Sequence, residues 1–152
     1  MRPNVESPWS RILPLFAVSL FAGSVWAADT APLSSVEGDA YSIGIADAKL
    51  KAGGEGRVLV TVKAKSGYHV NDKYPHKVKV DEPPRGLEVA KRELKKDDGK
   101  FKDPQTFELA IPVKANSAGS YTLGVEVKTS VCSETKCLMK TERLTAKLTA
   151  TP

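Results

Sequence analysis

The most regular feature of the chain is the alternation of apolar and polar residues. Alternation with a period of two places every second side chain on one face, which is typical of a β-strand with one buried face. The clearest alternating segments are 58–64, 107–113, 121–127 and 144–150, and further candidates are 41–49, 77–80 and 87–93. Turn signals rich in glycine, proline, asparagine and serine separate them, at 53–54, 66–67, 83–84, 98–99 and 116–119.

About seven short strands at this spacing predict an all-β fold, a two-sheet antiparallel β-sandwich. No segment has a convincing helical period. The nearest is 87–96, but Pro83, Pro84 and Gly86 come directly before it and argue against a helix. We therefore expect one domain built of strands.

The N-terminal segment has the pattern of an export signal. Arg2 and Arg11 precede an apolar run over 12–25, and Ala27 closes a small-residue cleavage site. The run is shorter than the roughly 20 residues that a membrane span needs. We predict a signal peptide over 1–27, a flexible tail over 28–38 and a folded domain over 39–152. The expected location is the periplasm, with no stable membrane insertion after cleavage.

Charge adds little to this picture. The chain has 23 basic and 18 acidic residues, a formal net charge of +5, and its lysines are interspersed with acids and few aromatics. Such a distribution indicates a solvated surface, so we expect no nucleic-acid partner. The sequence also gives no reason to expect a cofactor.

The only cysteines are Cys132 and Cys137, and an exported chain meets an oxidising compartment in which they can form a disulfide. If 133–136 is the loop of a hairpin, opposed residues have numbers that sum to 269. This register sets Glu126 against Arg143 on one face and matches apolar residues on the other. It predicts that both cysteines point away from the core at one end of the sandwich, so that both sulfurs are reachable. It also puts Lys140 and Glu142 on the apolar face, which either a core edge or a bulge would explain.

Three roles are open for this pair. Short-loop disulfides in exported proteins are usually structural, yet a ring of six residues stabilises a fold by only about 2 kcal/mol in the chain-entropy model. A redox role is favoured by Lys136 and Lys140, which would stabilise a thiolate, and is opposed by Glu134.

The third role is a copper-type site. It would combine the cysteines with His69, His76 and Met139, close to Tyr68 and Tyr74 in sequence. Because no pair of these ligands has a characteristic metal spacing, we expect no metal.

Three segments together resemble a known family. They are 64–78, which includes Gly67-Tyr68-His69; 107–123, a pair of strands; and 131–138, the cysteine hairpin. In this order they resemble the N-terminal periplasmic domain of the thiol:disulfide interchange protein DsbD, and the likeness spans about 41–150. The resemblance implies an immunoglobulin-like sandwich with a redox-active cysteine pair that exchanges with protein thiols.

The resemblance also implies roles for individual residues. Cys137 would be the sulfur attacked by an incoming thiolate, and Cys132 the partner that leaves and later resolves the mixed disulfide. A cap loop would correspond to 93–103, with Phe101 as its only aromatic residue, and Tyr68, His69 and Lys136 would lie nearby. The hairpin has four residues between its cysteines, one fewer than in the best-known member of the family.

The expected partners follow from the same resemblance. The membrane bundle and thioredoxin-like module of the family are missing from this sequence, so we expect a thioredoxin-like or membrane electron donor in trans. Oxidised exported proteins would be the acceptors, and the chain would be a component of a protein-disulfide reductase. The alternative is a non-catalytic immunoglobulin-like binding or scaffold module with a structural hairpin disulfide.

Overall fold

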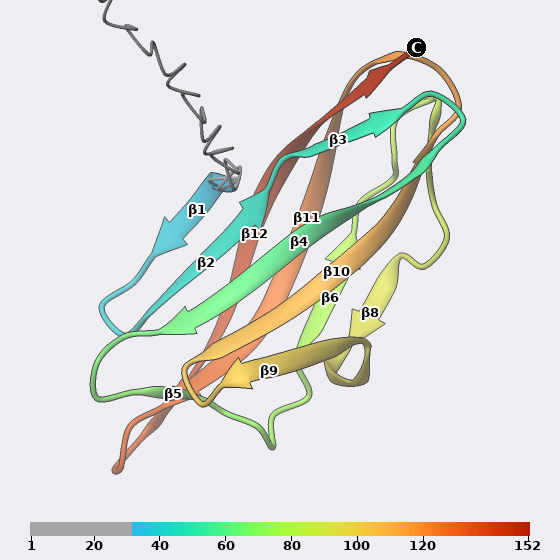
Figure 1. The fold of residues 1–152 in the computed structure, drawn as a ribbon. Helices are drawn as coiled ribbons and strands as arrows, with labels where there is room; N and C mark the ends of the chain where they lie inside the picture. The colour runs from blue at the N-terminus through green and yellow to red at the C-terminus, as the bar shows by residue number, and fades with distance from the viewer. Residues whose placement is uncertain (1–31) are drawn as a thin grey trace, which may run out of the picture.

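The structure is a computed structural model that describes residues 32–152. Its twelve strands form two six-stranded sheets, and the described part of the chain contains no α-helix (Figure 1). This confirms the predicted β-sandwich. The predicted signal peptide over 1–27 and the first residues of the predicted tail lie outside the described residues. No helix in the described part is long and apolar enough to cross a membrane.

Each sheet combines strands from both halves of the chain. The first sheet contains β1 (Pro32–Glu37), β2 (Tyr41–Ala46), β4 (Glu55–Ala64), β10 (Thr106–Ala115) and β7 (Leu87–Val89), with β9 (Gly99–Asp103) also beside β10. The second contains β3 (Ala48–Lys51), β12 (Cys137–Thr151), β11 (Gly119–Cys132), β6 (Lys77–Val80) and β8 (Glu93–Lys95), with β5 (His69–Val70) also beside β11. All pairings are antiparallel except that β3 runs parallel to β12, where we expected only antiparallel neighbours.

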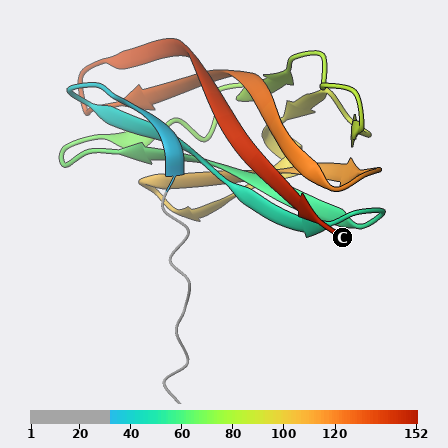
Figure 2. The same ribbon diagram turned by 90° about the horizontal axis from the view of Figure 1, so that it is seen from above.

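The alternating apolar residues face each other between the two sheets, which Figure 2 shows as two layers. The largest fully buried side chains come from β2, β4, β10, β11 and β12, and they include Ile43, Leu109, Ile111, Leu123 and Leu148. Burial of a side chain of this size contributes about 1.5–3 kcal/mol. The core therefore rests on the four segments with the clearest alternation, together with β2.

Two predicted strands are divided between the sheets. The segment 41–49 changes sheet at Asp47, so that β2 belongs to the first sheet and β3 to the second. The Asp47 carboxylate accepts a hydrogen bond from the Lys147 N–H at 3.0 Å and fixes this crossing. The segment 87–93 is divided in the same way into β7 and β8. Both halves bury apolar residues, so the period alone did not reveal the change of sheet.

The structure also differs from the predicted tail over 28–38, because Pro32–Glu37 forms strand β1. This strand pairs with β2 from Glu37 opposite Ser42 to Pro32 opposite Ala46. Among the β1 side chains that the structure describes, those of 34–37, Val36 packs against the core and is half-buried. Antiparallel pairing with β2 holds the strand in the first sheet.

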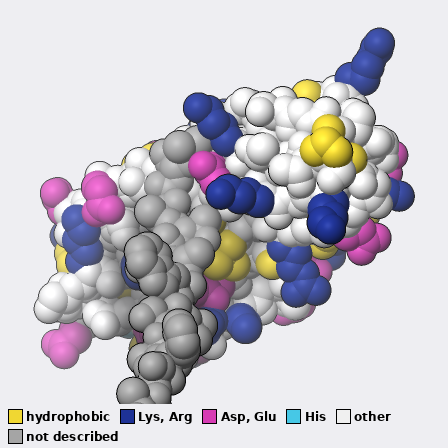
Figure 3. Space-filling view, turned by 45° about the horizontal axis from the view of Figure 1, so that its top comes forward, with side chains coloured by type: hydrophobic (Ala, Val, Ile, Leu, Met, Phe, Trp, Pro, Cys, Tyr) yellow, Lys and Arg dark blue, Asp and Glu magenta, His cyan; other side chains and the backbone are white. Residues whose placement is uncertain are grey.

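Charged side chains of both signs are scattered over the surface. On the face in Figure 3, lysines and arginines alternate with acidic residues, and apolar side chains form small patches. Several of the charges pair, including Arg143 with Asp81 at 2.6 Å and Lys77 with Glu93 at 3.3 Å. Exposed pairs of this kind contribute little to stability, and they keep the surface solvated.

Candidate functional site

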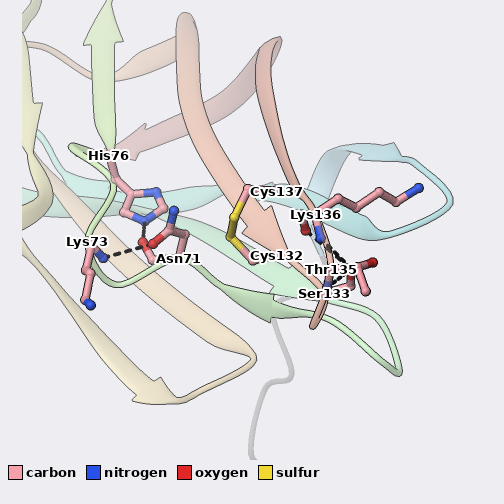
Figure 4. The surroundings of a disulfide bond; sticks show 8 residues. All are labelled: Asn71, Lys73, His76, Cys132, Ser133, Thr135, Lys136 and Cys137. Carbon is pink, nitrogen blue, oxygen red and sulfur yellow. Dashed lines mark hydrogen bonds between the residues drawn. A yellow bond between two sulfur atoms is a disulfide. The ribbon is translucent and has the colours of Figure 1, made fainter.

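The cysteine hairpin has the predicted register throughout. Strands β11 and β12 pair without a shift from Gly119 opposite Ala150 to Cys132 opposite Cys137, including Glu126 opposite Arg143. Cys132 and Cys137 form a disulfide with their Cα atoms 4.0 Å apart (Figure 4). The bond therefore joins two strands that already pair with each other.

A compact turn closes the hairpin. The Ser133 N–H donates to the Lys136 carbonyl oxygen at 2.8 Å, and the Ser133 hydroxyl oxygen accepts the N–H groups of Lys136 and Thr135 at 3.2 and 3.3 Å. Because Ser133 and Lys136 are a hydrogen-bonded pair, the cysteines beside them are a non-hydrogen-bonded pair, in which side chains come closest. The sequence of the turn thus positions the two sulfurs for bonding.

The two cysteines differ in their exposure. Cys137 is exposed, whereas Cys132 is only 5% exposed. Both lie on the face of the sheet that points away from the core, as predicted, but the expectation that both sulfurs are reachable is wrong for Cys132. The physical reason is a neighbouring strand that the hydrophobic pattern did not reveal, because it is only two residues long.

This strand is β5, which pairs with β11 so that His69 lies opposite Cys132 and Val70 opposite Val131. Directly opposed residues share a face of the sheet, so His69 is on the same face as the disulfide. The Asn71 N–H continues the pairing with a bond to the Ser130 carbonyl oxygen at 2.9 Å. Strand β5 and its continuation therefore flank Cys132 on the side away from Cys137.

Ser130 is a neighbour that the sequence reasoning missed. It lies two residues before Cys132 on the same face of β11 and is 1% exposed. Its hydroxyl is the one buried side-chain polar atom among the described residues that has no hydrogen-bond partner. Its spacing from Cys132 was visible in the sequence, but burial and the missing partner were not.

His76 ties the connection between β5 and β6 to the core. Its ring is 2% exposed and stacks on Phe107 with centroids 4.9 Å apart. Nε2–H donates to the Asn71 carbonyl oxygen at 2.7 Å, so Nδ1 accepts from the Thr129 hydroxyl at 2.9 Å in the neutral ring. Burial lowers the pKa of His76; the bond to Asn71 opposes this shift, and the charge of Lys96 adds to it.

These bonds bear on the copper-type interpretation. Both ring nitrogens of His76 are occupied by protein partners, so this residue is not available as a ligand. Within residues 32–152, no group of three or more His, Cys, Asp or Glu side chains is arranged to hold a metal ion. The geometry gives no support for a metal centre.

The predicted cap segment 93–103 forms β8, a short 3-10 turn (Lys96–Asp98) and β9. Phe101 on β9 is half-buried, and its ring lies 4.8 Å from Phe107 and 6.0 Å from His76 between centroids. It also lines a surface hollow together with His69. The segment therefore borders β5, while its role as a cap remains a prediction.

Two other predicted neighbours lie at the same end of the sandwich. Tyr68 is partly buried against the core just before His69. Lys136 is exposed in the turn of the hairpin, next to Cys137. Tyr68 therefore faces the core, and Lys136 lies in the turn beside the disulfide; the structure assigns neither a chemical role.

Lys140 and Glu142, the polar residues on the apolar face of β12, both lie beside Tyr41. The Tyr41 hydroxyl donates to Glu142 at 2.6 Å, and the Lys140 ammonium lies 5.8 Å from the centre of the Tyr41 ring. Burial, followed by this hydrogen bond to Glu142, raises the pKa of Tyr41 to about 12. The register is unbroken, so the core-edge explanation is correct and the bulge is not needed.

Comparisons with known proteins give only distant likenesses. No family model matches the chain, and no curated protein does. The N-terminal periplasmic domain of ScsB from Proteus mirabilis is 12% identical with a TM-score of 0.44, covering 75% of this chain and 51% of that one. AggA, the major subunit of aggregative adherence fimbriae type I from Escherichia coli, is 10% identical with a TM-score of 0.38, covering 76% of this chain and 98% of that one.

A PapD-like domain of human CEP192 is 11% identical with a TM-score of 0.37, covering 76% of this chain and 89% of that one. The chain spans about half the length of the ScsB structure. At these scores the likenesses identify neither a family nor an activity. The function must therefore be inferred from the geometry of the disulfide hairpin.

Proposed function

We propose that the chain is an exported thiol-disulfide exchange domain, which passes electrons between protein dithiols and disulfides through Cys132 and Cys137. The observation that carries the proposal is the unequal exposure of the two sulfurs at the tip of a hairpin. Figure 1 shows this tip extending beyond the rest of the domain at the lower left. One sulfur can be reached by another protein, while the other is kept in place beneath its neighbours.

This asymmetry supports a division of roles. A thiolate of the partner attacks Sγ of Cys137, a new S–S bond forms, and the Cys132–Cys137 bond breaks with Cys132 leaving as a thiolate. A second thiolate of the partner then attacks the partner's own sulfur in the mixed disulfide and releases Cys137. The partner dithiol becomes a disulfide, and two electrons reduce the domain. Reduction of an oxidised protein is the same sequence in reverse.

A structural disulfide is the second candidate, and the burial of Cys132 favours it. However, the bond closes a ring of only six residues, between strands that are fully paired without it. Its contribution of about 2 kcal/mol is less than half of the roughly 4.7 kcal/mol expected for a loop of about 100 residues. Stability alone is therefore a weak reason for this disulfide.

The reduction potential separates the two candidates. Equilibration of the purified domain in glutathione or dithiothreitol buffers should give a value more oxidising than about −280 mV, because structural disulfides usually lie below about −300 mV. A reduction potential below about −300 mV would overturn the proposed exchange function.

Trapping tests the division of roles. The Cys132→Ala variant should form a mixed disulfide with a thioredoxin-like protein through Cys137. The matched Cys137→Ala variant should form far less, because its remaining sulfur is buried. Adducts that form only through Cys132 would reverse the assignment.

A further inference from the structure

Beside the disulfide, strand β12 has an edge that pairs with no strand of the described residues, and β1 approaches it only farther along, at Thr145. The Ser133 N–H donates to the Lys136 carbonyl oxygen, so in this hairpin the even-numbered residues of β12 form the backbone hydrogen bonds with β11. The N–H and C=O groups of the odd-numbered residues of β12 therefore point away from β11. At the far end of β12 these outward groups have partners. The N–H of Thr145 donates to the Ser34 hydroxyl at 3.4 Å, the N–H of Lys147 donates to Asp47, and β3 pairs with 148–151.

The half of β12 that carries Cys137 lacks such partners. Over 137–143, the outward backbone groups of the odd-numbered residues form no hydrogen bond with any residue that the structure describes. Natural proteins usually cover or shorten an exposed strand edge, because it invites pairing with another chain. An open edge next to a reachable sulfur therefore points to a strand that arrives from outside.

Side chains along this edge indicate what the arriving strand contains. Cys137, Met139 and Thr141 are exposed on one face, and Met139, at 72%, is one of the two large exposed apolar side chains of the described chain. Lys136, in the turn, and Lys140, on the other face, form no ion pair within residues 32–152. Lys140 lies close to the Tyr41 ring, and the acidic Glu142 on the same face is bonded to the Tyr41 hydroxyl. An apolar side chain would cover Met139, and acidic side chains would pair with the two lysines.

We propose that the exchange partner docks by adding an extended, cysteine-bearing segment with acidic neighbours to the 137–143 edge of β12. This inference rests on the proposed function for the role of the partner's cysteine. Edge addition gives affinity through main-chain hydrogen bonds and selectivity through alternate side chains. A residue opposite Cys137 in an added antiparallel strand has its Cα about 5.5 Å away, within the usual range for a disulfide.

The same placement lines up the three sulfurs. Cys132 is on β11, Cys137 on β12, and the partner's cysteine would be on the strand beyond, so the attacking sulfur approaches Cys137 from the side opposite the leaving sulfur. Displacement at sulfur proceeds along this line. The equivalent approach to Cys132 is taken by β5, which occupies the other side of β11. Docking at the edge therefore selects Cys137 as the sulfur that is attacked.

A short peptide tests the docking without the natural partner. Thr-Thr-Glu-Val-Glu-Cys-Glu-Val-Glu-Thr-Thr reads the same in both directions, so it can add in parallel or antiparallel, and with its cysteine opposite Cys137 it spans 132–142. In its unreactive form, with serine for cysteine, it should slow amide hydrogen exchange at Met139 and Thr141. The same peptide N-methylated at both valines and at the two outer glutamates loses inward N–H groups in either direction, so it should leave exchange unchanged. Equal protection by both peptides, or none by either, would overturn the proposal.

Kinetics then connect docking to chemistry. The cysteine thiolate of the peptide should attack Cys137 and form a mixed disulfide, with Cys132 leaving as a thiolate, about tenfold faster than in the N-methylated form. A tenfold ratio corresponds to about 1.4 kcal/mol, the size of one or two backbone hydrogen bonds. The rate with each peptide is divided by the rate at which dithiothreitol reduces the same protein variant, which corrects for differences in the reactivity of the disulfide itself. Thr141→Pro removes an outward N–H and should abolish the tenfold preference, whereas Thr141→Ala, which keeps it, should not. Met139→Pro provides the same test if the first variant folds poorly.

The outcomes distinguish this proposal from the proposed function. A preference that survives Thr141→Pro and Met139→Pro would refute edge docking and leave the exchange function intact. A reduction potential below about −300 mV would instead refute the exchange function, whatever the peptide does. Concentration-dependent dimers whose Thr141→Pro variant is monomeric would assign the edge to a second copy of this chain and overturn the choice of occupant.

Discussion

Replacement of His76 should have a large effect on stability, although this residue lies outside the disulfide. The imidazole fills space against Phe107 and satisfies the Asn71 carbonyl and the Thr129 hydroxyl. His76→Ala leaves a cavity and two buried polar groups without partners, which together cost about 3–4 kcal/mol. His76→Gln keeps an N–H donor and an acceptor in one side chain and should lose less than half as much.

The pH dependence of the free energy of unfolding tests the burial of His76 more directly. The pKa of His76 is lowered in the folded protein, so the unfolded chain binds a proton first as the pH falls. Stability is therefore fully present above the unfolded pKa of about 6.5 and is lost as the pH falls toward the folded value. In this window the free energy of unfolding falls by at most about 1.4 kcal/mol for each pH unit.

Urea unfolding of the oxidised domain at several pH values between about 7.5 and 5.5 measures this slope, in a window above the carboxylate titrations. The slope should be present in the wild type and absent in His76→Gln. His69 is exposed and provides the matched control, because His69→Gln should keep the wild-type slope. Equal slopes in the wild type and in His76→Gln would refute the reasoning.

Two further predictions concern the disulfide and its neighbour. Reduction of the Cys132–Cys137 bond should lower the free energy of unfolding in urea by only about 2 kcal/mol, and a loss above about 4 kcal/mol would contradict the minor role of its small ring. Ser130→Ala should cost no stability and should gain up to about 1 kcal/mol, because the buried hydroxyl has no partner to lose. A loss above about 1 kcal/mol in thermal or urea unfolding would show that the hydroxyl is bonded after all.

The β11–β12 hairpin was predictable residue by residue because its register depends on local signals. Alternation fixed the apolar face, and the opposite charges of Glu126 and Arg143 chose the same alignment as the cysteines. The burial of Cys132 was not predictable, because it depends on the two-residue strand β5, which is too short to show a period. The bond between His76 and the Asn71 backbone is likewise invisible in the sequence, since any residue at position 71 would offer that carbonyl.

The parallel pairing of β3 with β12 has a consequence for the order of folding. Ala48 lies opposite Leu148 and Lys51 opposite Thr151, so this edge of the second sheet joins segments about a hundred residues apart. Contacts of such long range close large loops and tend to form late, whereas the cysteine hairpin closes over a few residues. In a chain that emerges N-terminus first, β3 has no partner until the last strand has been made. The two sulfurs can therefore meet in a formed hairpin before the sheet that carries them is complete.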